Sequence, residues 1–359
     1  MFFSSKTKGY FVEQTDHSVL LARTSSLTAP MVIEELRRCP MGDPDVVAET
    51  ASVIQPKASS SGYMNATCSV YPSKRFIRRA SLELKRVKEP TYFAELFSSQ
   101  FRLDLEKYTI HVISSNDGSD IDFATTSQKE VIFCGLPSED VVVAQDQLLS
   151  LGFYPDQLEL GTVSTLGALV DYFAFTKSKT PTLVLEIGTD TTHSYIVSAS
   201  GVEASRLIPQ GLDAMVPIVQ KELNLKDEES AKKLFYSNTF NFTSMGPLLV
   251  KKLLKELQSS IGFYEVQTGQ SVGQVICTQL PEKLGWLAGA IATALSISVP
   301  KLELVPWLQS RQITLSDNVA RLNLDASWLG LLSLMITKAP APAPEPAAAT
   351  NAVPPAKKD

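Results

Sequence analysis

The sequence contains few of the residues that carry metal or disulfide chemistry. Its 359 residues include only three histidines and four cysteines, and the cysteines form no Cys-x-x-Cys pair. Cysteines spaced this widely argue against a disulfide framework and against a zinc site, and they favour a reducing, cytoplasmic compartment. We expect surface or structural roles for the histidines and predict no metal site. The residues concerned are Cys39, Cys68, Cys134, Cys277, His17, His111 and His193.

Long apolar runs and an excess of positive charge are also missing. The two most apolar stretches, 286–299 and 328–336, are shorter than the roughly 20 residues that cross a bilayer, so both are predicted to be buried helices. We expect no signal peptide, because Phe2 and Phe3 are followed at once by polar residues. The formal net charge of −5 argues against nucleic-acid binding and against electrostatic adsorption to anionic lipid.

The length and the order of local patterns indicate a chain of more than one domain. A chain of 359 residues is too long for one simple core and suits two domains. The patterns alternate between strand and helix, which predicts mixed α/β packing. They are a hairpin at 10–22, a short helix at 30–38, a helix at 90–101, and strands at 109–114 and 130–134. The Ala/Pro-rich segment 338–359 is predicted to be a semi-extended, disordered tail.

The most informative segment runs from Leu183 to Thr192. A β-run ends at Gly188 and is followed by hydroxyl side chains, a pattern typical of a phosphate-binding loop. Because the chain continues as a strand and then returns in another, the loop is predicted to be the tight turn of a β-meander. A P-loop would instead open a helix. An ordinary hairpin with threonines on its solvent face is the alternative reading of the same ten residues.

Three later segments follow this loop in the order and spacing of one family. They are the turn Ile208-Pro209-Gln210-Gly211, an acidic helix start at 227–234, and an amphipathic helix at 253–264. Together with 183–192 they resemble PilM, the cytoplasmic actin-like protein of type IV pilus assembly, over roughly residues 5–335. The resemblance implies an α/β, actin-like (ribonuclease H-like) fold of two domains, with an inserted α/β subdomain.

The resemblance also implies where these parts begin and end. The first part of domain 1 would cover 1–50, and the inserted subdomain would cover 51–157. The chain would return to domain 1 at 158–180, form domain 2 at 181–300, and return again to domain 1 at 301–337, before the tail at 338–359.

Proteins of this fold class hold ATP between two phosphate loops and a purine slot, and two of these three elements are altered. The second loop is largely retained, with Glu186 in place of aspartate. Residues 13–18, Glu-Gln-Thr-Asp-His-Ser, replace the Asp-x-Gly-Ser-x-Ser of the first loop, and no glycine lies between Gly9 and Gly42. The Cβ of Thr15 would block the backbone from phosphate. Asp16 would add a repulsion of a few kcal/mol at an effective dielectric of about 20.

The purine slot is altered in the same direction. The family has a Gly-Gly pair after a strand that corresponds to 273–276, whereas this chain reads Cys-Thr-Gln-Leu-Pro at 277–281, so side chains would stand where the adenine ring lies. We therefore expect no bound nucleotide and assign no catalytic residue. If a site for ATP and magnesium is retained, its residues would be Glu13, Thr15, Ser18, Glu186, Gly188, Thr189, Asp190, Thr191, Thr192 and Thr278.

Two functions of different classes follow from these residues. The first is a non-catalytic scaffold of a type IV pilus or related secretion platform, held at the inner membrane by its partners. It would grip the cytoplasmic N-terminal peptide of a single-pass, PilN-like protein in a groove beside the inserted subdomain, roughly residues 50–155. The second is an actin-fold ATPase or small-molecule kinase. There Glu13 and Glu186 would hold a metal-bound water, and Thr189 and Thr191 would cradle the γ-phosphate.

Overall fold

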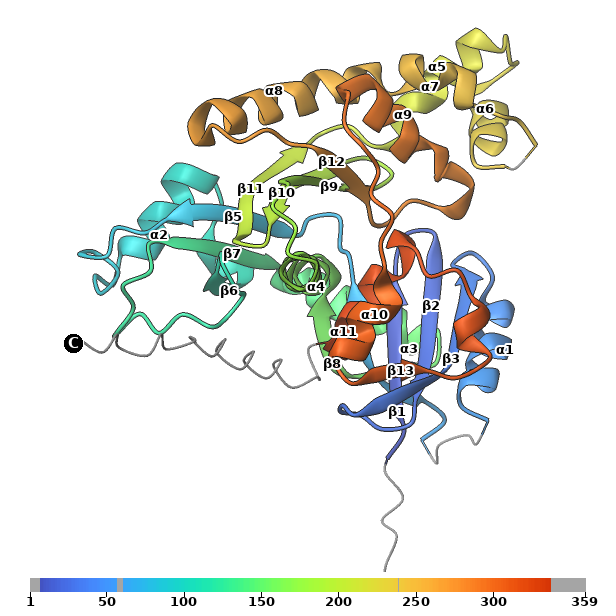
Figure 1. The fold of residues 1–359 in the computed structure, drawn as a ribbon, viewed down its shortest axis with the longest axis horizontal. Coiled ribbons are helices and arrows are strands. Elements are labelled where there is room, and N and C mark those ends of the chain that lie inside the picture. Colours follow the sequence, from blue (N-terminus) through green and yellow to red (C-terminus); the bar gives the residue numbers. More distant parts are fainter. Residues whose placement is uncertain (1–6, 57–60, 238, 337–359) are drawn as a thin grey trace, which may run out of the picture.

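The computed structural model describes residues 7–56, 61–237 and 239–336. Three β-sheets, of six, four and three strands, organise this part of the chain. Figure 1 shows the six-stranded sheet at the lower right, the four-stranded sheet above it near the centre, and the three-stranded sheet at the left. The predicted tail at 338–359 lies outside the described residues.

The six-stranded sheet contains the N-terminal hairpin at its centre. Its order is β13-β3-β2-β1-β4-β8, in which β1 and β2 are antiparallel while β4 and β8 add in parallel to β1. Neighbouring side chains alternate between its faces: Phe11 packs with helices α4, α10 and α11, and Val12 with α1 and α3. The elements are β1 (Gly9–Gln14), β2 (Ser18–Thr24), β3 (Met31–Pro40), β4 (Met64–Val70), β8 (Phe153–Leu160), β13 (Ile313–Leu315), α1 (Pro44–Ile54), α3 (Ser138–Ser150), α4 (Gly161–Phe175), α10 (Leu304–Ser310) and α11 (Leu329–Ile336).

The four-stranded sheet is the predicted meander with one parallel strand added, in the order β11-β10-β9-β12. Leu183 and Leu185 of β9 face a helical layer, which includes the predicted acidic and amphipathic helices, α6 and α8. The carboxylate of Asp227 caps α6 by accepting from the backbone N–H of Ser230. The elements are β9 (Thr182–Ile187), β10 (Thr192–Ser198), β11 (Gly201–Ile208), β12 (Gln274–Cys277), α5 (Val216–Glu222), α6 (Glu228–Phe235), α7 (Gly246–Leu249), α8 (Lys251–Thr268) and α9 (Trp286–Leu295).

The three-stranded sheet forms a small unit with its own aromatic core. It is antiparallel, in the order β5-β7-β6, and Phe97 and Phe133 meet edge to face with ring centroids 5.2 Å apart. Helix α4 lies between the two larger sheets, since it contacts β8 of one and β10 and β11 of the other. The elements are β5 (Phe76–Ser81), β6 (Tyr108–Ser114), β7 (Glu130–Pro137) and α2 (Tyr92–Leu96), which continues as a π-helical turn, Phe97–Phe101.

The segment predicted as a helix at 30–38 is a strand, β3. Its partner β2 is antiparallel, and a register shift leaves one residue of β3 unmatched between Ile33 and Glu35. Such a bulge puts Ile33 and Leu36 on the same buried face, although they are three residues apart. That spacing imitates the period of a helix, so the prediction was wrong.

The inserted unit is also smaller than the range 51–157. Strands β4 and β8 hydrogen-bond within the six-stranded sheet, and α1 and α3 pack on that sheet. The separate three-stranded sheet spans only β5 to β7. Local patterns do not reveal this boundary, because the strands on either side of the insertion pair with each other and with β1 only in three dimensions.

Candidate functional site

The ends of β1 and β9 bring the two expected acidic residues to one place. Glu13 is the fifth residue of β1 and Glu186 the fifth residue of β9, and each strand leads directly into its expected phosphate loop. Both side chains are 1% exposed. The two carboxylates are therefore held within the protein, and neighbouring protein groups contact both of them.

Glu186 is neutralised by an arginine that the sequence did not single out. Arg75, in the turn between β4 and β5, donates from Nη2 to Glu186 Oε2 at 2.8 Å. Thr162, in the first turn of α4, donates to the same oxygen at 2.7 Å and accepts from Arg75 Nε at 2.8 Å. Arg75 is 8% exposed. This carboxylate thus already has a cation and two donors.

Glu13 is held by a tyrosine in an apolar setting. The hydroxyl of Tyr71 donates to Glu13 Oε1 at 2.8 Å, and Gly330 of α11 approaches so closely that a Cβ there would lie 1.9 Å from the same oxygen. Burial raises the pKa of Glu13 to about 7, although the hydrogen bond from Tyr71 lowers it in part. Its protonation is therefore sensitive to pH near neutrality.

The first loop uses its own backbone N–H groups. The hydroxyl of Thr15 accepts from the backbone N–H of Ser18 at 3.0 Å and of His17 at 3.3 Å, and Thr15 donates its own N–H to the Ser18 carbonyl at 2.9 Å. A phosphate-binding loop needs such N–H groups to point at the anion. Here they are consumed by a side chain at the position where the family has glycine.

The second loop is the tight turn between β9 and β10. The N–H of Gly188 donates to the Thr191 carbonyl at 2.9 Å, and the hydroxyl of Thr192 donates to the Gln210 carbonyl at 2.7 Å. Gly211 packs directly on the loop, because a Cβ at this residue would lie 2.4 Å from the carbonyl oxygens of Gly188 and Thr189. Thr189 and Thr191 are half-buried, and Asp190 is exposed at the tip.

The side chain of Tyr236, the residue after α6, meets His17 of the first loop. The rings of His17 and Tyr236 have centroids 5.7 Å apart, and the Tyr236 hydroxyl donates to Asp213 at 3.1 Å. Burial lowers the pKa of His17, and the charges of Asp16 and Asp213 offset part of this shift. The imidazole is therefore neutral at pH 7 and supplies no positive charge for a phosphate.

A cavity of about 620 Å³ lies beside the first loop and the expected purine slot. Of the predicted site residues, Glu13, Thr15, Ser18 and Thr278 line it. Within the described residues, Thr278 Oγ1 and the side-chain nitrogen of Gln279 are buried here without a hydrogen-bond partner. Cys277 instead packs into the core, where burial raises its pKa to about 12. The cavity has room for a small polar molecule.

These contacts do not fit a magnesium–triphosphate group. The first-loop N–H groups are bonded to Thr15, and the Glu186 carboxylate faces Arg75. Asp16 adds negative charge near the second loop, since its carboxylate lies 3.8 Å from the position of a Cβ on Gly188. Across the described part of the chain, no group of three or more His, Cys, Asp or Glu side chains is arranged to hold a metal ion.

A second cavity, of about 490 Å³, lies between the inserted sheet and helices α4 and α11. We call it the junction groove. Its apolar wall consists of aliphatic side chains from both sides, and its polar residues include Asp117, Glu159 and Asp171. Asp171 is already bonded to Trp307 Nε1 at 2.8 Å and to Arg311. The aliphatic residues are Ile77, Ile113, Ile132, Val163, Leu166, Val170 and Ile336.

Comparison with known proteins adds evidence on the fold. No protein-family model and no curated protein matches the sequence. Among solved structures, a chain of the "PilM-PilN type IV pilus biogenesis complex" superposes with a TM-score of 0.66 at 15% identity, over 93% of this chain and 99% of that one. The chain has the actin-like fold of PilM. Ethanolamine utilization protein EutJ from Carboxydothermus hydrogenoformans superposes with a TM-score of 0.45 at 9% identity, over 92% of this chain and 89% of that one.

This PilM-like fold confirms the predicted fold class and the predicted resemblance, while the identities of the site residues remain predictions. Sequence reasoning located the two turns that are predicted to be phosphate loops, because each is a short continuous segment after a strand. It missed Tyr71, Arg75 and Thr162, the partners of the two carboxylates. No local signal marks Arg75, since Arg78 and Arg79 follow it within one short segment.

Proposed function

We propose that this chain is a PilM-like scaffold protein of a type IV pilus or related secretion platform. It binds the cytoplasmic N-terminal peptide of a single-pass, PilN-like inner-membrane protein, contacts other proteins of the platform, and does not hydrolyse ATP. The observation that carries the proposal is the junction groove, an apolar cavity between the inserted unit and the first domain. The similarity to a chain from a PilM–PilN complex supports it.

The groove has the features that an extended peptide requires. Strand β6 contributes Ile113 and Ser114 to the lining, and it is an edge strand of its sheet. At the groove this edge is already paired, because Ile113 bridges Asp120 and the N–H of Ser114 donates to the Ser119 carbonyl. The groove would therefore hold a peptide mainly through aliphatic side chains that accept its apolar residues. Helix α4 forms the facing wall with Val163, Leu166 and Val170.

The altered cleft supports a role without ATP turnover. A triphosphate would meet a first loop whose N–H groups are bonded to Thr15, and a metal would meet a Glu186 carboxylate that is paired with Arg75. The cavity of about 620 Å³ beside the first loop has room for a small molecule. An ATPase or small-molecule kinase is therefore the alternative function to test. Such an enzyme also needs a general base. Glu13 lines this cavity but accepts a hydrogen bond from Tyr71, and Glu186 is paired with Arg75.

Association with the membrane is proposed only through the partner. Among the residues that the structure covers, no helix has both the length and the apolar character of a bilayer span. The proposed location is therefore peripheral, at the cytoplasmic side of the inner membrane.

The test uses a synthetic peptide that matches the cytoplasmic N-terminus of a single-pass protein encoded beside this one. We expect the full-length chain to bind it with a Kd of about 1 μM or lower, a typical scale for short segments. A Gly167→Phe variant should weaken binding at least about tenfold. Gly167 lines the groove on α4, and a Cβ there meets no atom within 4 Å, so the new side chain enters the groove without disturbing the fold.

Gly289→Phe is the matched control. Gly289 is also a helical glycine with no atom within 4 Å of an added Cβ, but it lies on α9 of the second domain. It should leave peptide affinity unchanged. The proposal is wrong if no such peptide binds, or if the two variants bind it equally well while both remain folded.

A further inference from the structure

Arg75 joins three parts of the molecule at one buried point. It precedes β5 of the inserted unit by one residue, its partner Thr162 is the second residue of α4, and its partner Glu186 lies near the end of β9 in the second domain. Its Nη1 also donates to the carbonyls of Tyr71 at 3.3 Å and Pro72 at 3.2 Å. The guanidinium is therefore bonded along its whole planar fork.

The contact between Arg75 and Thr162 lies where both walls of the junction groove begin. Ile77, two residues after Arg75, belongs to the wall formed by the inserted sheet. Val163, the residue after Thr162, belongs to the wall formed by α4. The bond between Arg75 and Thr162 thus fixes the distance between the points where the two walls begin, and Glu186 ties that pair to the second domain.

The histidine near Arg75 carries no positive charge of its own. Burial, together with the positive charges of Arg75 and Arg78, lowers the pKa of His193 to about 2, so the neighbouring imidazole is neutral. Arg75 is also the cation that pairs with Glu186. In an actin-like nucleotide site this carboxylate would face the metal. Here the side chain of Arg75 links Thr162 of α4 to Glu186 of β9.

We propose that Arg75 is a tethered cation that stands in for the metal–nucleotide group at Glu186 and positions the two walls of the junction groove. Nucleotide is therefore not needed to hold the inserted unit, α4 and the second domain in the peptide-binding arrangement. The part of this inference that concerns peptide affinity rests on the proposed function. The part that concerns the arrangement of domains does not.

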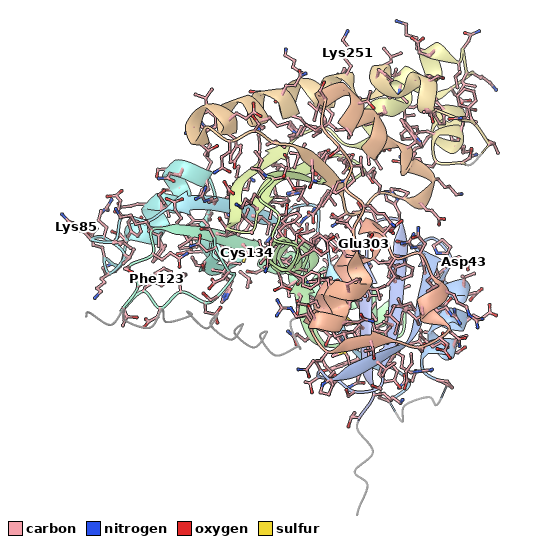
Figure 2. The ribbon with its side chains drawn as sticks, in the orientation of Figure 1. Asp43, Lys85, Phe123, Cys134, Lys251 and Glu303 are labelled. Atoms are coloured by element: carbon pink, nitrogen blue, oxygen red, sulfur yellow. The ribbon has the colours of Figure 1, made fainter. Side chains whose placement is uncertain are left out.

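Two readouts on the full-length chain test it. The first is the distance distribution between spin labels at Lys85→Cys and Lys251→Cys, measured by pulsed electron paramagnetic resonance. Both residues are exposed, on the inserted unit and on α8 of the second domain, and both point outward in Figure 2. The four native cysteines are buried, so labelling is selective. The second readout is the Kd for the partner peptide, with and without Mg–ATP.

Arg75→Met should broaden the distance distribution and weaken peptide binding at least about tenfold, because it leaves Glu186 buried without a cation partner. Arg75→Lys, which keeps the charge but not the fork, should fall between this variant and the wild type. Adding Glu186→Gln to Arg75→Met removes the buried charge that has lost its cation and should restore part of both readouts. Mg–ATP should change neither readout in the wild type.

Arg206→Met is the matched control, since Arg206 pairs with Glu256 at the surface of the second domain. It should leave both readouts unchanged. A folded Arg75→Met or Arg75→Lys variant with the wild-type distance distribution overturns the inference, and so does a change in the wild-type distribution on addition of Mg–ATP. If Arg75→Met does not fold, Arg75→Lys and Thr162→Val decide the question. Failure of the wild type to bind any peptide would instead count against the proposed function, and the distance measurement would still judge the role of Arg75.

Discussion

Replacing Glu13 with glutamine should stabilise the protein at neutral and alkaline pH. Glu13 is 1% exposed, and one of its oxygens accepts from Tyr71. Burial raises its pKa from the ordinary value of 4.5 to about 7. Above pH 7 the wild-type protein holds a buried charge that the unfolded chain would expose to water. Glutamine keeps the shape and the acceptor for Tyr71, and it removes the charge.

The sign and the size follow from the two pKa values. Because the folded pKa is above the unfolded one, the stabilisation that Glu13 contributes is fully present below about pH 4.5 and is lost as pH rises through about 7. The full loss corresponds to about 3 kcal/mol in the free energy of unfolding. The stability of the glutamine variant relative to wild type should therefore increase between these pH values and then level off.

Urea unfolding of both proteins from about pH 5 to about pH 9 measures this difference. Glu34→Gln is the control at a surface site. Although partial burial opposes it, hydrogen bonds from Lys8 and Arg23 lower the pKa of Glu34. Glu34→Gln should therefore not stabilise the protein at high pH. Parallel stability curves for wild type and Glu13→Gln across this range would refute the reasoning.

Two further predictions concern the cleft. Purified protein should neither bind Mg–ATP tightly nor release phosphate, as measured by isothermal titration and a phosphate-release assay; a submillimolar Kd with hydrolysis abolished by Glu186→Ala would contradict this. Gly211→Ala should lower the free energy of unfolding by about 3 kcal/mol, because its Cβ would lie 2.4 Å from two carbonyl oxygens of the second loop. Gly42→Ala, where an added Cβ meets no atom within 4 Å, should have little effect in the same denaturation experiment.

The sequence by itself determined the elements whose residues are neighbours along the chain. The N-terminal hairpin, the meander of β9 to β11 and helices α6 and α8 all follow from local periodicity, turn residues and caps such as Asp227. The two turns predicted to be phosphate loops were located for the same reason, since each is a few consecutive residues after a strand. The loss of the first-loop glycine at Thr15 was likewise readable from the sequence.

The tertiary structure alone decided how distant segments combine. Strands β4 and β8 joined the first sheet because partners far along the chain set their pairing. Strand β3 pairs with its neighbour β2 through a bulge and with the distant strand β13. The same holds for the cleft. Arg75 and Glu186 are 111 residues apart, and nothing near either residue in the sequence favours the pair. This ion pair exists only in the folded chain, where β9, α4 and the turn before β5 bring both groups to one buried point.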